Sequence, residues 1–438
     1  MSSNTETGIR ILKTNTPTVG IVGLGYVGLP VALGFAKKYK VIGYDINNTR
    51  ITSLKNHVDE TKEVSESSLR EAAIEFTIDP VKLEKCNVII VTVPTPLNKY
   101  KEPELSHIIG ASKTIGENLN KGTIVIYEST VFPGATEEIC IPLLEHHSGL
   151  RSEVDFFVGY SPERINPGDK EHTFPTIEKV VAAQSKLALE EIYRLYQNVI
   201  DAKIHKASSI KVAEASKIVE NTQRDINIAF MNELSIIFRN LGINTYEVLD
   251  AAKSKWNFLP FTPGLVGGHC IGVDPYYLIH KSKMEGYTPK FITTARYIND
   301  QMPTVIADFI VKYIDDRRQN HDLPRVGVLG ITFKENVPDI RNSKAIEIIE
   351  RLNNFGIEIY VHDPYVNEEV ISAPIKLVDW NQLNQLDIII LAVPHHVYLN
   401  KDVEEFVQLF RNKQGLIMDI KGVLQQFNIP EGIEVISL

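Results

Sequence analysis

Cysteine is scarce in this chain, and long apolar runs are missing. Three cysteines, Cys86, Cys140 and Cys270, are spread over 438 residues, and no Cys-x-x-Cys pair points to a zinc site or a redox pair. No apolar run approaches the roughly 18 residues that a membrane span needs, and the polar stretch from Met1 to Thr16 predicts no signal peptide. We therefore expect a cytoplasmic protein with no metal site and no membrane anchor.

Positive charge is also in short supply. The formal net charge is −9, which argues against nucleic acid or an anionic membrane as the main partner. An anionic small ligand is still compatible with this charge, because helix N-termini and a few basic side chains can hold phosphates locally. The apolar content of 43% is ordinary for a globular protein, and the length predicts two or three domains of roughly 150 residues each.

The first structural signal is a glycine-rich turn between two predicted strands. In chain order it consists of a strand from Thr18 to Val22, the glycines Gly23, Gly25 and Gly28, a helix from Leu29 to Tyr39, and a strand from Lys40 to Tyr44 that ends at Asp45. Such a unit binds a dinucleotide through its glycine turn and its acidic residue. We predict NAD rather than NADP, because Asp45 would repel a 2′-phosphate. Tyr26, Val27 and Arg50 complete the predicted cofactor residues of this turn. The alternative is a glycine-rich turn in another kind of α/β domain.

Three further strands predicted in this part of the chain end in polar residues. They are Asn87 to Val93, followed by Pro94 and Thr95; Thr123 to Tyr127, followed by Glu128, Ser129 and Thr130; and Phe156 to Tyr160, followed by Ser161 to Gly168. Ligands of open α/β sheets bind beyond the carboxyl ends of the strands. Pro94, Thr95 and Thr130 should therefore face the nicotinamide half of the site, with helix capping as the alternative for Thr130. The segment after Tyr160 is either a binding loop or a surface turn.

The pattern then changes to one long helix from Ile210 to Leu241, ended by Gly242. Its apolar residues recur at three- and four-residue steps: Val212, Ala215, Val219, Ile226, Ile228, Phe230, Leu234 and Ile237. Most of this helix should be core or subunit contact. Lys217 and Asn221 share one face, either as a functional pair or as a solvated one.

A cysteine lies in the glycine-rich loop from Pro263 to Pro275. Glycines let the backbone approach a ligand closely, so a thiol in this loop could be reached from several sides. Cys270 is either a nucleophile or a small apolar residue in a tight turn. A polar helix from Thr293 to Asp300 and a charged linker from Asp315 to Pro324 should come after this loop.

The strand pattern of the first domain partly recurs after this linker. The predicted strands are Arg325 to Leu329, followed by Gly330; Ile357 to Val361, followed by His362 and Asp363; Asp387 to Val393, followed by Pro394; and Leu416 to Ile420. They predict a second, smaller doubly wound domain, which lacks the GxGxxG turn. Lys334, Arg341 and Lys421 lie at strand ends or in the loops after them, where an anion would bind. Each could also be an ordinary surface charge.

Several of these motifs occur together in one protein family. They are GLGYVGLP at 23–30, ESTV at 128–131, SPER at 161–164, Lys217 with Asn221, GGHCIGVDP at 267–275, and FK-x-x-x-x-D-x-R at 333–341. In this order they resemble the nucleotide-sugar 6-dehydrogenases, which include UDP-glucose, GDP-mannose and UDP-N-acetylhexosamine dehydrogenases. The resemblance implies an α/β fold of two doubly wound Rossmann-like domains joined by a long-helix central segment. It divides the chain into an NAD domain (1–206), a helical dimerisation segment with the cysteine loop (207–314) and a UDP-binding domain (315–438).

The resemblance also implies a four-electron oxidation of the sugar C6 alcohol to an acid, through a thiohemiacetal and a thioester, with two NAD⁺. The implied roles are Cys270 as nucleophile, Asp274 and Thr130 holding or activating a water, Lys217 stabilising oxyanions, Asn221 positioning the substrate and Glu163 shuttling protons. The implied substrate-binding residues are Glu163, Arg164, Lys217, Asn221, Phe258, Gly267, Lys334, Arg341 and Lys421.

Local differences from the glucose and mannose members favour the UDP-N-acetylhexosamine branch. His269 precedes the cysteine, Gly272 and Val273 precede Asp274, and ERINPG occupies 163–168. UDP-N-acetylglucosamine is the first choice, before its galactosamine and mannosamine epimers and UDP-glucose. Lys421 stands where glucose enzymes tend to use an arginine. His269 could supply a cation to the thiol or pack the loop.

Two other hypotheses are open. A two-electron hydroxyacid dehydrogenase also joins a dinucleotide domain to a long helix, but it gives no role to Cys270 or to a second α/β domain. A non-catalytic nucleotide-sugar sensor or scaffold would not need Cys270, Lys217 and Asp274 together. We expect a homodimer or a larger homo-oligomer, and a uronic acid product that feeds a surface polysaccharide such as a capsule or O-antigen.

Overall fold

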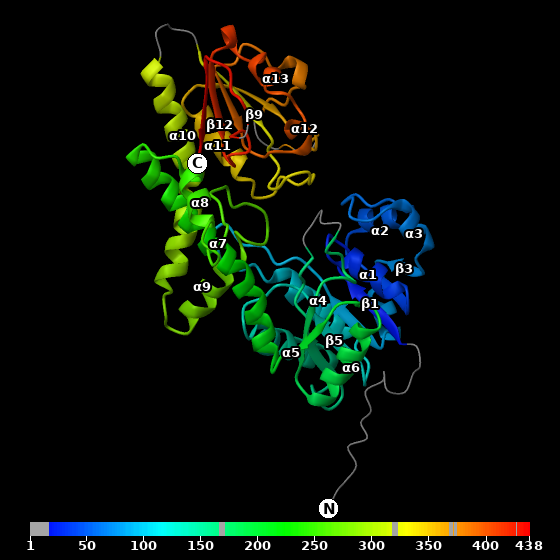
Figure 1. Cartoon of the computed structure of the whole chain (residues 1–438). Coiled ribbons are helices and arrows are strands. Elements are labelled where there is room, and N and C mark those ends of the chain that lie inside the picture. Colours follow the sequence, from blue (N-terminus) through cyan, green and yellow to red (C-terminus); the bar gives the residue numbers. More distant parts are fainter. Residues whose placement is uncertain (1–16, 166–170, 318–322, 368–370, 372–374, 426) are drawn as a thin grey trace, which may run out of the picture. The chain divides into compact units, whose positions relative to one another are not determined.

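The structure is a computed structural model that describes residues 17–165, 171–317, 323–367, 371, 375–425 and 427–438. The chain forms two compact units, shown from blue to red in Figure 1. The first unit takes the described residues up to Glu220 together with Tyr276–Tyr287. The second takes Asn221–Pro275 and the described residues from Thr288 onward. Each unit is built on a sheet with helices on its faces, so the predicted α/β class is confirmed.

The first unit contains an eight-stranded sheet in the order β3-β2-β1-β4-β5-β6-β7-β8. Its strands are β1 (Thr18–Val22), β2 (Lys40–Tyr44), β3 (Ile74–Thr77), β4 (Val88–Val91), β5 (Ile124–Tyr127), β6 (Phe157–Tyr160), β7 (Lys179–Ala183) and β8 (Ile204–Lys206). All neighbours are parallel except β6 and β7. Every residue of β4 and β5 is buried, as expected for parallel strands covered on both faces. The order β3-β2-β1-β4-β5-β6 is that of a doubly wound dinucleotide domain.

Six α-helices of the first unit flank this sheet. They are α1 (Gly28–Ala36), α2 (Asn48–Lys55), α3 (Glu66–Glu71), α4 (Ser106–Glu117), α5 (Ile141–Ser148) and α6 (Lys186–Gln197). The prediction that α1 extends to Tyr39 is wrong. The N–H groups of Lys38 and Tyr39 both turn back to the carbonyl of Phe35, at 3.0 and 2.9 Å, and this turn leads directly into β2.

The long helix α7 (Ile210–Leu241) has the predicted bounds, and Gly242 comes after it with a φ of +69°. The next helices are α8 (Thr245–Lys253), α9 (Asp274–Met284) and α10 (Lys290–Arg317). The polar helix predicted at 293–300 is much longer in the structure, because α10 continues through Pro303. Burial of Met302, Ile306 and Ile310 along α10 offsets the cost of an interior proline, about 3 kcal/mol. The predicted linker therefore begins later, and its residues 318–322 lie outside the described part of the chain.

The second unit contains a five-stranded, fully parallel sheet in the order β10-β9-β11-β12-β13. Its strands are β9 (Arg325–Leu329), β10 (Glu358–His362), β11 (Ile388–Leu391), β12 (Gly415–Asp419) and β13 (Ile433–Ser437). Helices α10 and α11 (Lys344–Asn353) share a hydrophobic cluster with one face of the sheet, and residues of α12 (His396–Leu399) and α13 (Val403–Val407) share a second cluster with other strand residues. This is the second, smaller doubly wound domain that the sequence predicts.

None of the helices in the described part of the chain combines the length and the apolar character that crossing a bilayer requires.

Candidate active site

The glycine turn after β1 is fixed by backbone contacts to the next strand. Gly23 has a φ of +91°, and its N–H donates to the carbonyl of Tyr44 at 2.9 Å. The N–H of Leu24 donates to Asp45 Oδ2 at 2.8 Å. A side chain at Gly28 would collide with the carbonyl oxygen of Gly23. The turn therefore requires glycine at both of these positions and places Asp45 beside it.

The same turn leaves space where a cofactor pyrophosphate would lie. A Cβ added at Gly25 would meet no atom within 4 Å, so the exposed backbone there borders an open region just before α1. Tyr26 and Val27 continue this turn into the helix. Asp45 is partly exposed, and each carboxylate oxygen has lone pairs beyond those used by backbone donors. These residues fit a dinucleotide whose phosphates meet the backbone and whose ribose meets Asp45.

Arg50 supports the turn from inside the fold. Its side chain is buried, its Nε donates to the carbonyl of Leu24 at 2.8 Å, and its Nη1 lies 2.8 Å from Asp59 Oδ1. Burial opposes the ionisation of Asp59, but hydrogen bonds from Thr61 and Arg50 lower the pKa of this carboxyl below its usual value. Arg50 thus holds the turn in shape, and its direct contact with the cofactor stays a prediction.

The residues just after β4 and β5 meet at the carboxyl edge of the sheet. Thr95 Oγ1 donates to the carbonyl of Thr130 at 2.7 Å, and Ser129 Oγ donates to the carbonyl of Val93 at 2.7 Å. Pro94, between Val93 and Thr95 in sequence, is exposed to solvent. The structure therefore brings together the three residues predicted to face the nicotinamide.

Glu163 is buried just beyond β6. Its Oε1 accepts N–H groups from Arg164, at 2.6 Å, and from Ile165. The Arg164 guanidinium points elsewhere, pairing with Glu220 and donating to the carbonyl of Glu178 at 3.0 Å. The rest of the predicted loop, residues 166–168, lies outside the described part of the chain.

The three cysteines differ in accessibility. Cys86 and Cys140 are buried, and burial raises the pKa of each thiol to about 12. Cys270 is only partly buried. Its carbonyl accepts the N–H groups of Val273, at 3.0 Å, and Asp274, at 2.9 Å, so the loop turns directly into α9. Cys270 is therefore the accessible thiol of the chain, which favours the nucleophile over the buried structural cysteine.

A buried polar pair stands close to this loop in sequence. Asn221 Nδ2 donates to Asp274 Oδ2, and both residues are almost fully buried. Arg224 donates in turn to Asn221 Oδ1. Lys217, one turn earlier on α7, is also buried. The solvated alternative for Lys217 and Asn221 is wrong, since both point into protein.

The glycines of the cysteine loop allow it to lie against the segment after β9. Gly268 has a φ of +77°, and a Cβ there would lie 2.6 Å from the Phe333 ring. A Cβ at Gly267 would lie 2.7 Å from the carbonyl oxygen of Asn342. The His269 ring meets Phe333 edge-on at 5.4 Å between centroids. This contact supports the packing role for His269.

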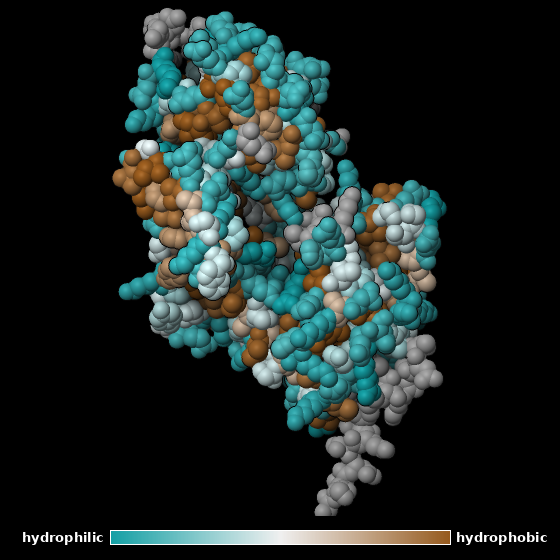
Figure 2. Space-filling view, in the orientation of Figure 1, coloured by the Kyte–Doolittle hydropathy of each residue, from teal (hydrophilic) through white to brown (hydrophobic). Residues whose placement is uncertain are grey.

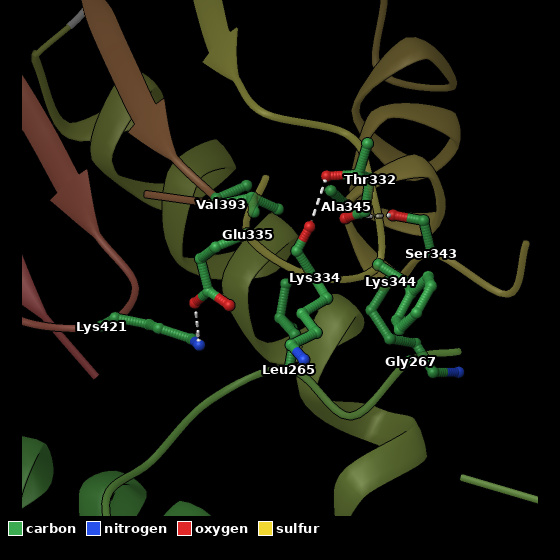
Figure 3. Close-up of a pocket in the computed structure, with 12 residues that line it drawn as sticks. Leu265, Gly267, Thr332, Lys334, Glu335, Ser343, Lys344, Ala345, Val393 and Lys421 are labelled. Atoms are coloured by element: carbon green, nitrogen blue, oxygen red, sulfur yellow. Dashed lines mark hydrogen bonds and ion pairs between the residues drawn. The ribbon is translucent and has the colours of Figure 1, made fainter. Parts of the chain in front are cut away.

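A small pocket opens between this loop and the second sheet (Figure 3). It is lined by Leu265, Gly267, Thr332, Phe333, Lys334, Glu335, Ser343, Lys344, Ala345, Ala392, Val393 and Lys421. The lining carries three lysines and one glutamate, and Lys421 pairs with Glu335. Lys344 is also paired, with Asp300 and Glu347. A lining with more lysines than carboxylates suits an anionic ligand. Gly267, Lys334 and Lys421, predicted from separate motifs, are brought together here.

Two predicted substrate residues lie apart from the residues that line this pocket. Arg341 pairs with Asp339 at 2.6 Å, and its side chain is 53% exposed. Phe258 is partly buried in the segment after α8. Their roles stay predictions. Lys344 does line the pocket, although it was not predicted from the sequence, because a lysine that begins a helix carries no pattern of its own.

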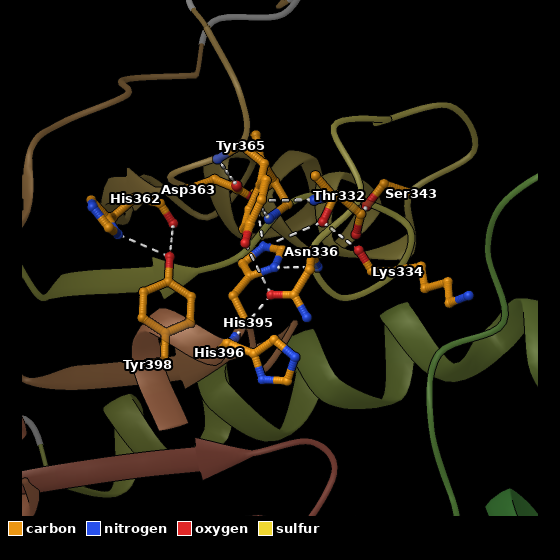
Figure 4. A network of polar contacts seen from close by, with 11 residues as sticks. Thr332, Lys334, Asn336, Ser343, His362, Asp363, Tyr365, His395, His396 and Tyr398 are labelled. Atoms are coloured by element: carbon orange, nitrogen blue, oxygen red, sulfur yellow. Dashed lines mark hydrogen bonds and ion pairs between the residues drawn. The ribbon is translucent and has the colours of Figure 1, made fainter. Parts of the chain in front are cut away.

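A buried histidine holds the loop that carries Lys334 (Figure 4). His395 Nδ1 accepts the N–H of Asn336 at 2.8 Å, and its Nε2 lies 3.1 Å from Asp363 Oδ2. The same carboxylate oxygen accepts the N–H of Ile331 at 2.6 Å. Burial opposes ionisation of Asp363, but the hydrogen bond to His395 and those from backbone donors lower the pKa of this carboxyl. Asp363 was expected at a strand end, but its histidine partner was not predicted.

Comparison with known proteins agrees with this geometry. Three domains defined for the UDP-glucose/GDP-mannose dehydrogenase family match the chain: the NAD binding domain at residues 17–200, the central domain at 211–301 and the UDP binding domain at 327–426. The predicted boundaries at 206 and 314 stay a prediction.

Individual relatives match over nearly the whole chain. Protein CapL of Staphylococcus aureus is 51% identical over 408 residues, which are 93% of this chain and 96% of CapL. The UDP-N-acetyl-D-glucosamine 6-dehydrogenase of Pseudomonas aeruginosa is 50% identical over 411 residues, 93% of this chain and 97% of that protein. The solved structure of the UDP-D-ManNAc dehydrogenase from Pyrococcus horikoshii superposes with a TM-score of 0.86 at 31% identity, covering 96% of this chain and 99% of that one.

These matches set aside the hydroxyacid dehydrogenase and the non-catalytic sensor. They also confirm the predicted cofactor, since the first matching domain is the family's NAD binding domain. The chain belongs to the UDP-glucose/GDP-mannose dehydrogenase family.

Proposed function

We propose that this protein is a UDP-N-acetylglucosamine 6-dehydrogenase, which oxidises the C6 alcohol of the sugar to a carboxylate. The observation that carries the proposal is an accessible thiol, Cys270, four residues before a buried Asp274 that is bonded to Asn221. The relatives from Pseudomonas aeruginosa and Salmonella typhi, 50% and 47% identical, bear this name. The sequence GGHCIGVDP favours the same branch.

Cys270 divides the four-electron oxidation into two hydride transfers. NAD⁺ bound at the glycine turn after β1 would supply the hydride acceptor for both oxidations. In the first, the C6 hydroxyl loses its proton as the hydride leaves, giving an aldehyde. The Cys270 sulfur then bonds to the aldehyde carbon, and the resulting thiohemiacetal loses a second hydride to become a thioester. Water attacks the thioester carbon, the carbon–sulfur bond breaks, and the acid leaves while the thiol is restored.

The buried polar residues supply the charges and proton acceptors for these steps. Asp274 and Thr130 hold or activate the water, and Asn221, fixed by Asp274, orients the sugar. Lys217 stabilises the oxyanion that develops at C6, as a preorganised cation can in a site from which water is excluded. Glu163 carries protons away from the reacting water.

The pocket of the second unit is the proposed site of the nucleotide diphosphate. Lys334 and Lys344 both line it (Figure 3), and the Lys344 ammonium is paired with Asp300 and Glu347. Lys421 reaches it from beyond β12, paired with Glu335. Arg341 is proposed to shape the same loop through its bond to Asp339. A lysine ammonium binds phosphate as a point charge, without a fixed geometry. These contacts therefore do not depend on an exact position of the lysine side chain.

Substrate comparison tests this proposal. We expect two NADH per molecule of acid, and a higher kcat/KM for UDP-N-acetylglucosamine than for UDP-N-acetylgalactosamine, UDP-N-acetylmannosamine or UDP-glucose. A preference for UDP-glucose would contradict the branch assignment. One NADH per substrate would contradict the mechanism.

Replacement of the nucleophile gives a second test. Cys270→Ser should lower acid formation by about a thousandfold, because a serine hydroxyl is a much weaker nucleophile than a thiolate. Cys140→Ser is the matched control, since Cys140 is buried beside polar groups of Ser112 and Tyr127. Acid production by Cys270→Ser at the rate of this control would refute the assignment.

The polarity of α7 supports a homodimer. Its buried residues include Lys217, Asn221 and Asp225, whereas apolar Phe230 and Ile237 are exposed at 52% and 44%. Figure 2 shows further hydrophobic residues gathered where α7 ends and α8 begins. An apolar face of this kind is typical of a subunit contact. Phe230→Asp should shift the sedimentation coefficient toward that of a monomer.

We also place the enzyme in the cytoplasm, because none of its three cysteines is in a disulfide, as is usual in a reducing compartment. The uronic acid product would then enter a surface polysaccharide, such as a capsule or O-antigen.

A further inference from the structure

A buried lysine lies between two buried carboxylates at the edge of the first sheet. Lys179 is the first residue of β7, and its side chain is 2% exposed. Its Nζ lies 2.9 Å from Glu128 Oε2, 3.8 Å from Glu163 Oε2 and 3.4 Å from the carbonyl oxygen of Pro162. Glu128 comes after β5 and Glu163 after β6, so one ammonium joins the ends of two neighbouring strands to β7.

The two carboxylates are held in different ways. Both oxygens of Glu128 are bonded, one by Lys179 and the other by the hydroxyl of Tyr196. Glu163 uses Oε1 for backbone donors, but its buried Oε2 accepts no hydrogen bond from the described residues. A buried carboxylate oxygen without a donor is costly. A hydrogen bond donated to this oxygen by a water or a substrate hydroxyl would therefore be stabilising.

The charges of this cluster do not cancel. Two carboxylates and one ammonium leave a net charge of −1 if all are ionised. Burial raises the pKa of Glu128; Lys179 opposes this shift and Glu163 adds to it. The aromatic rings of Phe174 and Tyr196, 5.6 and 5.4 Å from Nζ, add only a weak attraction for the cation.

Other charged groups near Glu163 are engaged elsewhere. Arg164 is bonded to Glu220 and to the carbonyl of Glu178. Among the ion pairs of the described residues, the cation within 4 Å of Glu163 is Lys179. Glu163 and Glu128 therefore share one ammonium, that of Lys179.

We propose that Lys179 is a positioning residue that holds the Glu163 carboxylate where it can accept a proton, and that Glu128 competes with Glu163 for the same ammonium. The inference rests on the proposed function. In the hydrolytic step, Glu163 takes a proton from the attacking water while the new carbon–oxygen bond forms. The carbon–sulfur bond then breaks, the acid is released, and the proton returns to the departing Cys270 sulfur.

The test is the rate of the hydrolytic step in single turnovers of full-length variants. Lys179→Met removes the ammonium that holds Glu163, so hydrolysis of the acyl-enzyme should slow about tenfold while the first hydride transfer keeps its wild-type rate. Glu128→Gln leaves the ammonium to Glu163 alone, so hydrolysis should be at least as fast as in the wild type.

The double variant Glu128→Gln/Lys179→Met is the control for misfolding, because its cluster has the same net charge as that of the wild type. Its rate of acyl-enzyme hydrolysis should lie between those of the wild type and Lys179→Met. In single turnovers of this variant, the first hydride transfer should keep its wild-type rate while an acyl-enzyme accumulates, detectable by its added mass. A merely structural lysine would not separate these two steps.

Two results overturn the inference alone: acyl-enzyme hydrolysis in the double variant at or above the wild-type rate, or slower hydrolysis in both Lys179→Met and Glu128→Gln. If the wild type makes no acid from any of the four UDP-sugars, the proposed function fails, and this inference fails with it.

Discussion

Gly23 and Gly330 come directly after the first strands of the two sheets, with φ values of +91° and +84°. The N–H of each donates at 2.9 Å to the last residue of the neighbouring strand, Tyr44 in one sheet and His362 in the other. An aspartate comes next in both cases. Asp45 accepts the N–H of Leu24 and Asp363 accepts that of Ile331. Up to this point the two domains are built alike.

The two domains differ in the segment after the turn. In the first sheet α1 begins at Gly28, so backbone at a helix start faces the ligand region, and Asp45 is partly exposed. In the second sheet a longer loop carries Lys334, α11 begins only at Lys344, and Asp363 is buried against His395. The turn in the first sheet offers backbone groups and a carboxylate to a ligand. The loop in the second sheet offers lysine ammonium groups.

The comparison shows how one scaffold can serve two ligands. An aspartate after the second strand ties the turn to the sheet in both units, which is a structural role. Its exposure decides whether it can also accept a ribose, and in the second unit His395 removes that possibility. The loop that His395 holds is then available for side chains that bind phosphate.

The largest effect should come from exchanging the carboxylates for amides. Asp363→Asn should destabilise the fold by about 3 kcal/mol, because a buried hydrogen-bonded charge network is broken. Asp45→Asn should cost under about 1 kcal/mol, because Asp45 is partly exposed. Urea unfolding of the two variants measures the difference. Equal losses of stability in the two variants would contradict the difference that we infer between Asp363 and Asp45.

Buried carboxylates should also differ in their response to pH. Burial raises the pKa of Glu214 on α7 from 4.5 to about 7, so the folded state binds this proton more tightly than the unfolded state. The associated stability is present at low pH and is lost as pH rises toward 7. Between about pH 5.5 and about pH 7.5 the free energy of unfolding should fall by roughly 2 kcal/mol from this group.

Glu214→Gln should flatten this part of the unfolding curve. Glu138→Gln is its control, because ion pairs with Lys281 and Lys211 lower the pKa of Glu138, which is then ionised throughout. Asp363 has a lowered pKa, so its stabilisation is lost only as pH falls below the ordinary range of a carboxyl group. The Asp363→Asn deficit should therefore be the same at both pH values.

Replacing Asp45 should weaken binding of the cofactor and leave binding of the UDP-sugar unchanged. Asp45→Asn should raise the KM for NAD about tenfold, equivalent to about 1.4 kcal/mol, and narrow the preference for NAD over NADP. The KM for the UDP-sugar should stay at the wild-type value. Initial-rate kinetics with either substrate varied would show the separation, and an unchanged KM for NAD would count against the ribose contact.

The smallest effect should come from the histidine that holds the second turn. His395→Gln should raise the KM for the UDP-sugar about fivefold, the loss of roughly 1 kcal/mol from the bond to Asn336, and leave the KM for NAD unchanged. His396→Gln, its exposed neighbour, is the control. Equal effects of the two substitutions would remove the role we give to His395.

Much of the fold could be predicted because the strands are short and wholly apolar. β4 and β11 are buried at every position, and glycine or proline comes after several strands. β3 and β13 were missed because they mix buried and exposed residues without a clear pattern. The full length of α10 was missed because the helix continues through Pro303, where tertiary burial outweighs the local cost of a proline.

The residues of the candidate site also fall into those that the sequence predicts and those that it does not. Gly23, Asp45, Cys270 and Lys334 belong to compact motifs that a sequence displays directly. Lys179 with Glu128, and His395 with Asp363, are separated by 51 and 32 residues. Such pairs have no local spacing or periodicity, so only the folded chain shows that their charges meet.

The unequal burial of the three cysteines has a practical consequence. An electrophile such as iodoacetamide needs an accessible thiol, and Cys86 and Cys140 are both shielded. The unmodified chain should therefore take up one label per subunit, at Cys270. The mass added to a single peptide would then count intact active sites in any preparation, and protection of that peptide by bound UDP-sugar would report occupancy without turnover.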